Sequence, residues 1–558
     1  MNWDNPVECN ISFDDGKLSG LRRSSGWAKN QYQYFVSMLS IEPSAVFVPG
    51  DSGFVKGKEV SGRESAMMLT FDMKSGEELL VKTGLSAVDT RGAEMNLQAE
   101  IPGWDFEKIR NEAWDRWNTE LGRISAESSD TDVLKVFYTS LYHSFMAPVL
   151  YSDVDSRYRG ADGEIHTAEG FINYTLFSLW DTFRAAHPLY TIVQPNRVPD
   201  MINSMLNIYK EQGKLPVWSL MANETNTMIG YHAVPVIADA MSKGISGFDY
   251  DLAYEAAKHS SELDFRGLNY YRQYGYVPAD LENESVSKTL EYAYDDWCIA
   301  SIAKINGDVV GFQKYSQRAD YYKNLFDTST GFMRGRLADG SWKEPFDPLY
   351  SSHRQDEYTE GNAWQYTWFV PHDIFGLVEL MGGKERFIER LDSLFILDEG
   401  VRGENASSDI SGLIGAYAHG NEPGHHTTYI YSVLGESAKT ETLVRKIMSE
   451  MYHTGIDGLC GNEDCGQMSA WYVFSALGFY PFNPADGRYY FGSPVIDRAS
   501  ISLPGNLLFT VEAKNNSPEN IHISGAELNG IRLDRNWITH EELMTGGTLV
   551  FNMTSDTR

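Results

Sequence analysis

Three short segments of the chain each place a carboxylic acid beside glycine and asparagine. Glu360 lies in Tyr358-Thr-Glu-Gly-Asn-Ala-Trp, Glu422 in Gly420-Asn-Glu-Pro-Gly-His-His, and Asp464 in Gly461-Asn-Glu-Asp-Cys-Gly-Gln. Each segment comes just before a helix-like run that contains aromatic residues. Carboxylates exchange protons, amides bind hydroxyl groups, and aromatic rings offer flat apolar surfaces. This combination is typical of sugar-processing sites, so we expect the three acids to converge on one cleft.

Asp464 precedes an apolar run that Gly478 can end, which predicts a helix with Asp464 at or near its N-cap. A helix N-terminus favours the ionised carboxylate. An ionised carboxylate can act as a general base on water. A residue that only caps the helix would occupy the same position.

Glu360 is subject to two opposing effects. The helix that follows it should lower its pKa, whereas a general acid needs a raised pKa. Tyr358, Trp364 and Trp368 are close enough in sequence to desolvate the carboxyl group and raise its pKa. The sequence alone leaves open which effect is larger.

Further polar residues lie at the starts of other helix-like runs. Trp180 and Asp181 form a pair in which the ring can stack on a sugar and the carboxylate can bind a diol, or both can belong to the core. Glu422 is followed by Pro423, a favoured first helical residue, so it can bind hydroxyl groups or a cation, or cap the helix. Calcium would need ligands from separate loops, such as Asn421, Glu422 and Asp464, because the chain has no EF-hand loop.

The elements that position these residues are predicted to follow one another along the chain. Residue patterns predict strands over 1–105, a linker helix over 106–130, helices over 131–481 and further strands over 482–558. Six helix-like segments start near Asp181, Met228, Ser287, Asn362, Pro423 and Asp464. Their spacing fits six pairs of inner and outer helices. We therefore predict a mainly α protein with an (α/α)6 toroid, the alternative being an open helical array.

Composition excludes several classes of function. The chain has 558 residues, is 42% hydrophobic and carries a net charge of −30. This predicts a globular protein of more than one domain that does not bind nucleic acid or anionic lipid. No apolar run is long enough for a membrane span, and the start of the chain has no signal-peptide pattern. Cys460 and Cys465 flank Asp464, and either a disulfide or two free thiols fits their spacing.

Several of these motifs together resemble glycoside hydrolase family 92, the calcium-dependent exo-α-mannosidases. The resemblance is carried by Ser178-Leu-Trp-Asp-Thr-Phe-Arg184, Leu215-Pro-Val-Trp218, Glu360-Gly-Asn-Ala-Trp-Gln-Tyr366, Gly420-Asn-Glu-Pro423 and the run from Gly461 to Trp471, ending in Gly478-Phe-Tyr-Pro481. It implies an N-terminal β-sandwich, a linker and an (α/α)6 toroid. The expected location of the full-length protein is periplasmic or extracellular.

The resemblance also implies roles for individual residues. Glu360 would be the general acid and Asp464 the general base of an inverting mechanism, in which roughly 6.5–9.5 Å between the carboxyl groups leaves room for water. Calcium would bind O2 and O3 of a terminal α-mannose, with Asn421, Glu422 and Asp464 as its ligands. The expected substrate-binding residues are Trp180, Asp181, Asn362, Asn421, Glu422, His425 and Asn462.

Three departures from the family pattern qualify these expectations. Asn462 stands where some members have a second acid, so it cannot share the role of base. Asn421 stands where some α-1,2-specific members have histidine, which leaves α-1,2 and α-1,3 linkages open. The Gly-rich first half of the sandwich is missing. We therefore expect a chain that begins inside this domain, with exposed strand edges.

Two other classes of function fit the same residues. A glycoside phosphorylase or a polysaccharide lyase can use an α/α toroid, although the acidic segments hold little of the Lys and Arg that phosphate would require. A chain that lacks part of a domain can also bind carbohydrate without turning it over. The sequence does not predict the oligomeric state.

Overall fold

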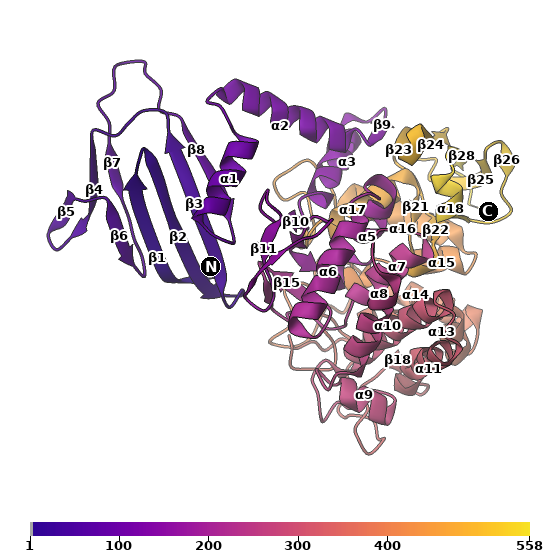
Figure 1. Cartoon of the computed structure of the whole chain (residues 1–558). Coiled ribbons are helices and arrows are strands. Elements are labelled where there is room, and N and C mark those ends of the chain that lie inside the picture. The colour runs from indigo at the N-terminus through magenta and orange to yellow at the C-terminus, as the bar shows by residue number, and fades with distance from the viewer. Residues whose placement is uncertain (1–3, 558) are drawn as a thin grey trace. The chain divides into compact units, whose positions relative to one another are not determined.

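Two groups of segments form separate contact networks in the computed structural model, which describes residues 4–557 (Figure 1). The first unit comprises Met1–Glu120, Pro148–Phe177 and Asn203–Thr227, and the second comprises Leu121–Ala147, Ser178–Ile202 and Met228–Arg558. The first unit therefore gathers three stretches that are far apart in sequence. The predicted linear limits at 105, 130 and 481 stay predictions.

An antiparallel sheet dominates the first unit. Its strand order is β6 (Glu59–Gly62), β1 (Asp4–Asp14), β2 (Lys17–Gly26), β3 (Gln31–Leu39) and β8 (Val81–Ser86). Asp15 and Gly16 join β1 to β2, and both have the positive φ that a tight hairpin turn requires. A smaller sheet contains β5 (Gly53–Lys56), β4 (Ala45–Gly50) and β7 (Met68–Thr70). β6 and β8 are the edge strands of the larger sheet.

Helix α1 (Thr90–Glu100) packs on β3 and β8, in a stretch that the sequence predicted to contain strands only. Asp89 caps the helix, and Ala93 and Leu97 bury their side chains against Val36. Gly84 permits this close approach, because a Cβ there would lie 2.2 Å from the carbonyl oxygen of Ala93. The prediction missed α1 because its apolar face is only two buried side chains wide.

The other elements of the first unit are short. They are β10 (Val149–Leu150), β11 (Arg157–Arg159), β12 (Ile165–Thr167), β13 (Tyr174–Thr175), β15 (Trp218–Leu220) and β16 (Asn223–Glu224). Three elements run across the divisions between the units: α2 (Phe106–Leu121), β14 (Phe177–Ser178) and α6 (Val198–Gln212).

Helices are the main regular elements of the second unit. They are α3 (Thr131–Ser144), α4 (Leu179–Thr182), α5 (Ala186–Val193), α7 (Ala233–Ser242), α8 (Tyr250–Glu262), α9 (Leu268–Tyr274), α10 (Ser285–Ile305), α11 (Val309–Ala319), η1 (Asp320–Leu325), α12 (Ala363–Tyr366), α13 (Ile374–Leu380), α14 (Lys384–Ile396), η2 (Glu422–Gly424), η3 (Thr427–Tyr429), α15 (Ile430–Val433), α16 (Ser437–Glu450) and α17 (Gln467–Leu477). Two small hairpins pair β17 (Phe326–Asp327) with β18 (Phe332–Met333) and β19 (Leu413–Ile414) with β20 (Tyr417–Ala418).

The helices that begin near the six predicted starts are largely buried. α10 and α17 bury most of their residues, and the buried residues of α10 include charged ones such as Glu291 and Asp295. α5 packs on α7, α7 on α10, and α10 on the more polar α11. α17, the last of these helices along the chain, packs on α16, α3 and α5. The last helix of this series therefore contacts the first.

The C-terminal strands form a six-stranded sheet. Its order is β26 (Ile531–Arg532), β25 (His522–Leu528), β28 (Gly547–Thr554), β24 (Leu507–Lys514), β23 (Arg498–Leu503) and β9 (Ile124–Glu127). β9 comes from the segment predicted as linker and pairs with β23. The remaining elements are β21 (Phe479–Tyr480), η4 (Pro484–Asp486), β22 (Arg488–Phe491), η5 (Pro504–Asn506), β27 (Trp537–Thr539) and α18 (His540–Met544).

The predicted combination of many helices with an N-terminal sheet and C-terminal strands is confirmed. All four cysteines are free, so Cys460 and Cys465 are two thiols. Within residues 4–557, no helix has the length and apolar character needed to cross a bilayer.

Candidate active site

Three acids from distant parts of the second unit come together at one point. Asp181, Glu422 and Asp464 each offer a carboxylate oxygen, and these oxygens lie within 4.8 Å of one another. Asp181 lies in α4, Glu422 opens η2, and Asp464 lies in the loop before α17. Asp181 and Glu422 are buried, whereas Asp464 is the most exposed of the three. The cluster therefore reaches the surface at Asp464.

Ionisation of this cluster is costly without a counter-charge. Burial, followed by the charge of Asp464, holds the pKa of Asp181 well above its usual range. Burial, followed by the charge of Asp181, does the same to the pKa of Glu422. Ser178 donates a hydrogen bond to Asp181 Oδ2, but Asp181 Oδ1 and Glu422 Oε1 have no partner among the described residues. Buried oxygens of this kind normally bind a donor or a cation.

This donor set fits a hard divalent cation. Calcium takes oxygen ligands at about 2.3–2.6 Å, so two ligands of one ion lie up to about 5 Å apart. The oxygens of Asp181, Glu422 and Asp464 meet that spacing. Two of the three expected calcium ligands, Glu422 and Asp464, are therefore in the cluster, and Asp181 accompanies them. The third, Asn421, donates its side-chain amide to the carbonyl oxygen of Glu360, 2.7 Å away.

Glu360 belongs to a second, neighbouring group. His353, Glu360 and Asp409 also bring one ligand atom each within 4.8 Å of one another, and all three are partly buried. Burial, followed by the charges of Asp409 and Asp464, raises the pKa of Glu360 to about 8. The question left open by the sequence is thus answered in favour of desolvation. After burial, the largest contribution to the raised pKa of Glu360 comes from the charge of Asp409, a residue that the sequence did not indicate.

Asp409 is held by side chains from two loops. Ser407 donates to Asp409 Oδ2 at 2.6 Å, and Asn462 donates to Oδ1 at 2.8 Å. Because the Ser407 proton is used in this way, the serine accepts from His353 Nδ1, 3.1 Å away. Asn462, expected to bind substrate, thus links the Asp464 loop to Asp409.

The position of Asp464 corrects the expectation of a helix cap. The N-cap of α17 is Gly466, two residues later, and Asp464, Cys465 and Gly466 all have positive φ. Burial, followed by the charge of Asp409, raises the pKa of Asp464 to about 6 instead of lowering it. The helix end is instead satisfied by Glu463, whose carboxylate accepts from the backbone N–H of Ser469 at 3.1 Å.

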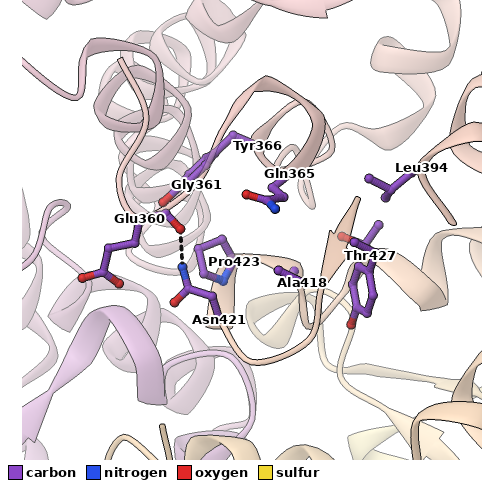
Figure 2. A pocket seen from close by; sticks show the side chains of 11 residues that line it. Glu360, Gly361, Gln365, Tyr366, Leu394, Ala418, Asn421, Pro423 and Thr427 are labelled. Atoms are coloured by element: carbon purple, nitrogen blue, oxygen red, sulfur yellow. Dashed lines mark hydrogen bonds between the residues drawn. The ribbon is translucent and has the colours of Figure 1, made fainter. Parts of the chain in front are cut away.

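The Glu360 loop is fixed by hydrogen bonds on both sides. Glu360 has a φ of 48°, and Asn362 caps α12 in a reciprocal pair with Gln365. Figure 2 shows Asn421 bound to the backbone of Glu360, while the Glu360 side chain extends away from Gln365 and Leu394. These last two residues line a small cavity behind the loop. The carboxyl group is therefore presented on the opposite side.

Three residues expected to bind substrate are instead buried in the protein. Trp180 is 1% exposed, donates to Glu291 at 3.1 Å and lies under the Arg184 guanidinium, so it cannot stack on a sugar. Asn362 is fully buried as a helix cap. Both ring nitrogens of His425, also fully buried, contact protein groups.

Comparisons with known proteins agree with a carbohydrate-active site built on carboxyl groups. A family model described as "Glycosyl hydrolase family 92 catalytic domain" matches residues 92–555. The chain therefore belongs to glycoside hydrolase family 92, as the motifs predicted.

Solved structures and a curated relative are also similar. A family 92 α-mannosidase from Bacteroides thetaiotaomicron, solved with mannoimidazole, is 39% identical with a TM-score of 0.95, covering 99% of this chain and 75% of that one. An inverting mannosidase of the same family and organism is 35% identical with a TM-score of 0.90, covering 99% and 77%. An "Uncharacterized secreted glycosidase" of Arthroderma benhamiae is 30% identical over 94% of this chain. The chain spans 66% of the length of that relative.

Proposed function

We propose that this protein is an exo-acting α-mannosidase that removes terminal α-1,2- or α-1,3-linked mannose from glycans with inversion. The observation that carries the proposal is the difference between two neighbouring carboxyl groups. Glu360 has a pKa of about 8 and is protonated at neutral pH, whereas Asp464 has a pKa of about 6 and is mostly ionised. An inverting glycosidase needs one acid and one base of this kind. The names of the two solved mannosidases support the choice of sugar and of stereochemistry.

In this mechanism Glu360 protonates the glycosidic oxygen as the bond to the leaving sugar breaks. Asp464 takes a proton from the water that attacks the anomeric carbon from the opposite face. Asn421 holds the backbone of Glu360, and Asn462 holds Asp409 beside it. These contacts keep the acid in place without using the carboxyl oxygens that react.

Asp181, Glu422 and Asp464 would hold the calcium ion. The support for this assignment is that two of their buried oxygens lack a partner and that all three pKa values are raised. Calcium, when bound, would supply positive charge that binds vicinal sugar hydroxyl groups and favours ring distortion. The same charge would allow all three carboxylates to ionise together.

We also infer the closed (α/α)6 toroid and a periplasmic or extracellular location. Contact between α17 and α5 supports ring closure, and the secreted relative supports the location.

The test is release of free mannose from α-1,2- and α-1,3-mannobiose, measured with calcium and after thorough chelation by EDTA. We expect release with calcium, loss on chelation and recovery on re-addition. Turnover that requires phosphate would instead indicate a phosphorylase, and a product absorbing in the ultraviolet would indicate a lyase. Mannose binding without turnover would indicate a binding protein. Activity that survives chelation would remove calcium from the proposal.

A further inference from the structure

One uncharged side chain connects the three segments that carry Asp181, Glu422 and Asp464. Gln467, in the first turn of α17, is fully buried. Its Oε1 accepts from the backbone N–H groups of Ala185 at 2.9 Å and Ala186 at 3.1 Å. Its Nε2 lies 3.0 Å from His425 Nδ1. The amide oxygen of Gln467 thus binds the segment that follows Asp181, and its amide nitrogen binds the segment that follows Glu422.

The direction of each hydrogen bond is fixed by its partner. His425 Nε2 lies 3.1 Å from the carbonyl oxygen of His419, which can only accept, so Nε2 carries the proton. Burial lowers the pKa of His425 to about 3, so the ring is neutral and Nδ1 is a lone pair. Gln467 Nε2 must donate to it, and Oε1 must face Ala185 and Ala186. Only one orientation of the amide satisfies all three partners.

Each of the three segments makes its hydrogen bond with Gln467 or His425 about one helical turn after its carboxylate residue. Ala185 follows Asp181, His425 follows Glu422, and Gln467 follows Asp464, by three or four residues in each case. The carboxylates cannot hold one another at this spacing, because like charges repel and two of their oxygens lack a partner. A neutral amide and a neutral imidazole hold the segments without adding charge.

We propose that Gln467, together with His425, is a positioning residue that sets the spacing of Asp181, Glu422 and Asp464 and thereby the affinity of the cluster for its cation. The inference rests on the proposed function for the identity of that cation. It assigns to His425 a role behind the site, in place of the substrate contact expected from the sequence. It also gives a reason for a fully buried glutamine at the start of α17.

The test compares calcium binding by isothermal titration calorimetry with thermal stability, kcat and KM. Gln467→Met keeps the volume of the side chain and removes all three hydrogen bonds. We expect calcium affinity and kcat each to fall at least tenfold. Ser475→Ala is the matched control, because Ser475 is buried on the same helix and bonds only Tyr429 OH, 2.8 Å away. It should lower thermal stability while leaving calcium affinity within twofold of the unmodified protein.

The histidine provides a second, independent series. His425→Asn can place an amide oxygen near the position of Nδ1 and still accept from Gln467, whereas His425→Leu cannot. Calcium affinity should therefore be retained better in His425→Asn than in His425→Leu. Equal affinities in these two variants, or unchanged affinity in Gln467→Met, would overturn the inference. The histidine pair also decides the matter if Gln467→Met does not fold.

Calcium binding by the unmodified protein distinguishes failure of the proposed function from failure of this inference. If the unmodified protein binds no calcium, the cation assignment fails, and crystal structures of the unmodified protein and of Gln467→Met or His425→Leu become the readout. Carboxylate oxygens that move beyond 4.8 Å of one another would still support the positioning role of Gln467 and His425. Oxygens that keep their spacing would exclude it.

Discussion

Glu360 and Asp464 differ in pKa because their surroundings differ. Both have raised pKa values with burial as the first cause and the charge of Asp409 as the second, and the charge of Asp464 raises the pKa of Glu360 further. Glu360 therefore holds its proton up to about pH 8, while Asp464 loses it near pH 6. One group can donate a proton in the pH range in which the other can accept one.

Substitution of these two residues should affect different substrates. Glu360→Gln should abolish cleavage of mannosides with poor leaving groups but spare much of the rate on activated aryl mannosides, because only a poor leaving group needs protonation. Asp464→Asn should lower both rates by a similar factor. Acid and base assistance are each worth about 10²–10⁴-fold. Steady-state rates on the two substrate types check this, and equal losses for Glu360→Gln would remove Glu360 from the role of acid.

The pH profile of the unmodified enzyme should be bell-shaped. The rate should rise where Asp464 ionises, at a pH below about 6 when calcium is bound because the cation favours the carboxylate, and fall through about 8, where Glu360 loses its proton. Asp409→Asn removes a negative charge that raises both pKa values, so both limbs should move to lower pH. Asp457→Asn, at an exposed aspartate, is the control and should leave the profile unchanged. Limbs that stay in place in Asp409→Asn would contradict this assignment of the charges.

The sequence indicated Glu360 and Asp464 as candidate acid and base but did not indicate Asp409. Glu360, Glu422 and Asp464 stand in recognisable motifs before helices, whereas Asp409 lies in a run of Ser, Asp and Gly without a helix after it. Its importance depends on Asn462 and Ser407 holding it, and those contacts exist only in the folded chain.

The loop from Gly461 to Gly466 is the element on which the site depends most. The sequence predicted the helix after it and its end at Gly478, where the structure has a left-handed C-cap. It misplaced the N-cap because three successive residues adopt positive φ, a conformation that local preference disfavours for Asp464 and Cys465. This conformation turns the Asp464 carboxylate toward Asp181 and Glu422.

Gly466→Ala should therefore disrupt the loop. Gly466 has a φ of 87°, and a Cβ there would lie 2.6 Å from Ser144 Cα. A left-handed alanine costs about 1–2 kcal/mol, and forced overpacking adds about 1–3 kcal/mol. Urea unfolding followed by circular dichroism should show the summed loss, together with a large fall in kcat.

Gly487→Ala is the matched control for this change. Gly487 also has positive φ, but a Cβ there would meet nothing within 4 Å. It should lose only about 1–2 kcal/mol and keep its activity. Equal losses in the two variants would show that the approach to Ser144 does not constrain the loop.

At the scale of the whole molecule, local sequence patterns predicted individual helices and strands better than they predicted which unit or sheet each segment belongs to. The helices near Ser287 and Asn362 begin close to the predicted residues, because capping and apolar periodicity are local properties. The assignment of 148–177 and 203–227 to the first unit, and of β9 to the C-terminal sheet, depends on contacts between distant segments. No local pattern in a single sequence encodes such contacts.

The central claim is that this chain hydrolyses a terminal α-mannoside with inversion, using Glu360 and Asp464. Proton NMR of α-mannobiose during the first minutes of reaction with calcium tests it most directly, because the anomeric signals identify the released sugar and its configuration. The account predicts that β-mannose appears first and then equilibrates to the α anomer. Initial release of α-mannose, or no release of mannose from either linkage, would contradict it.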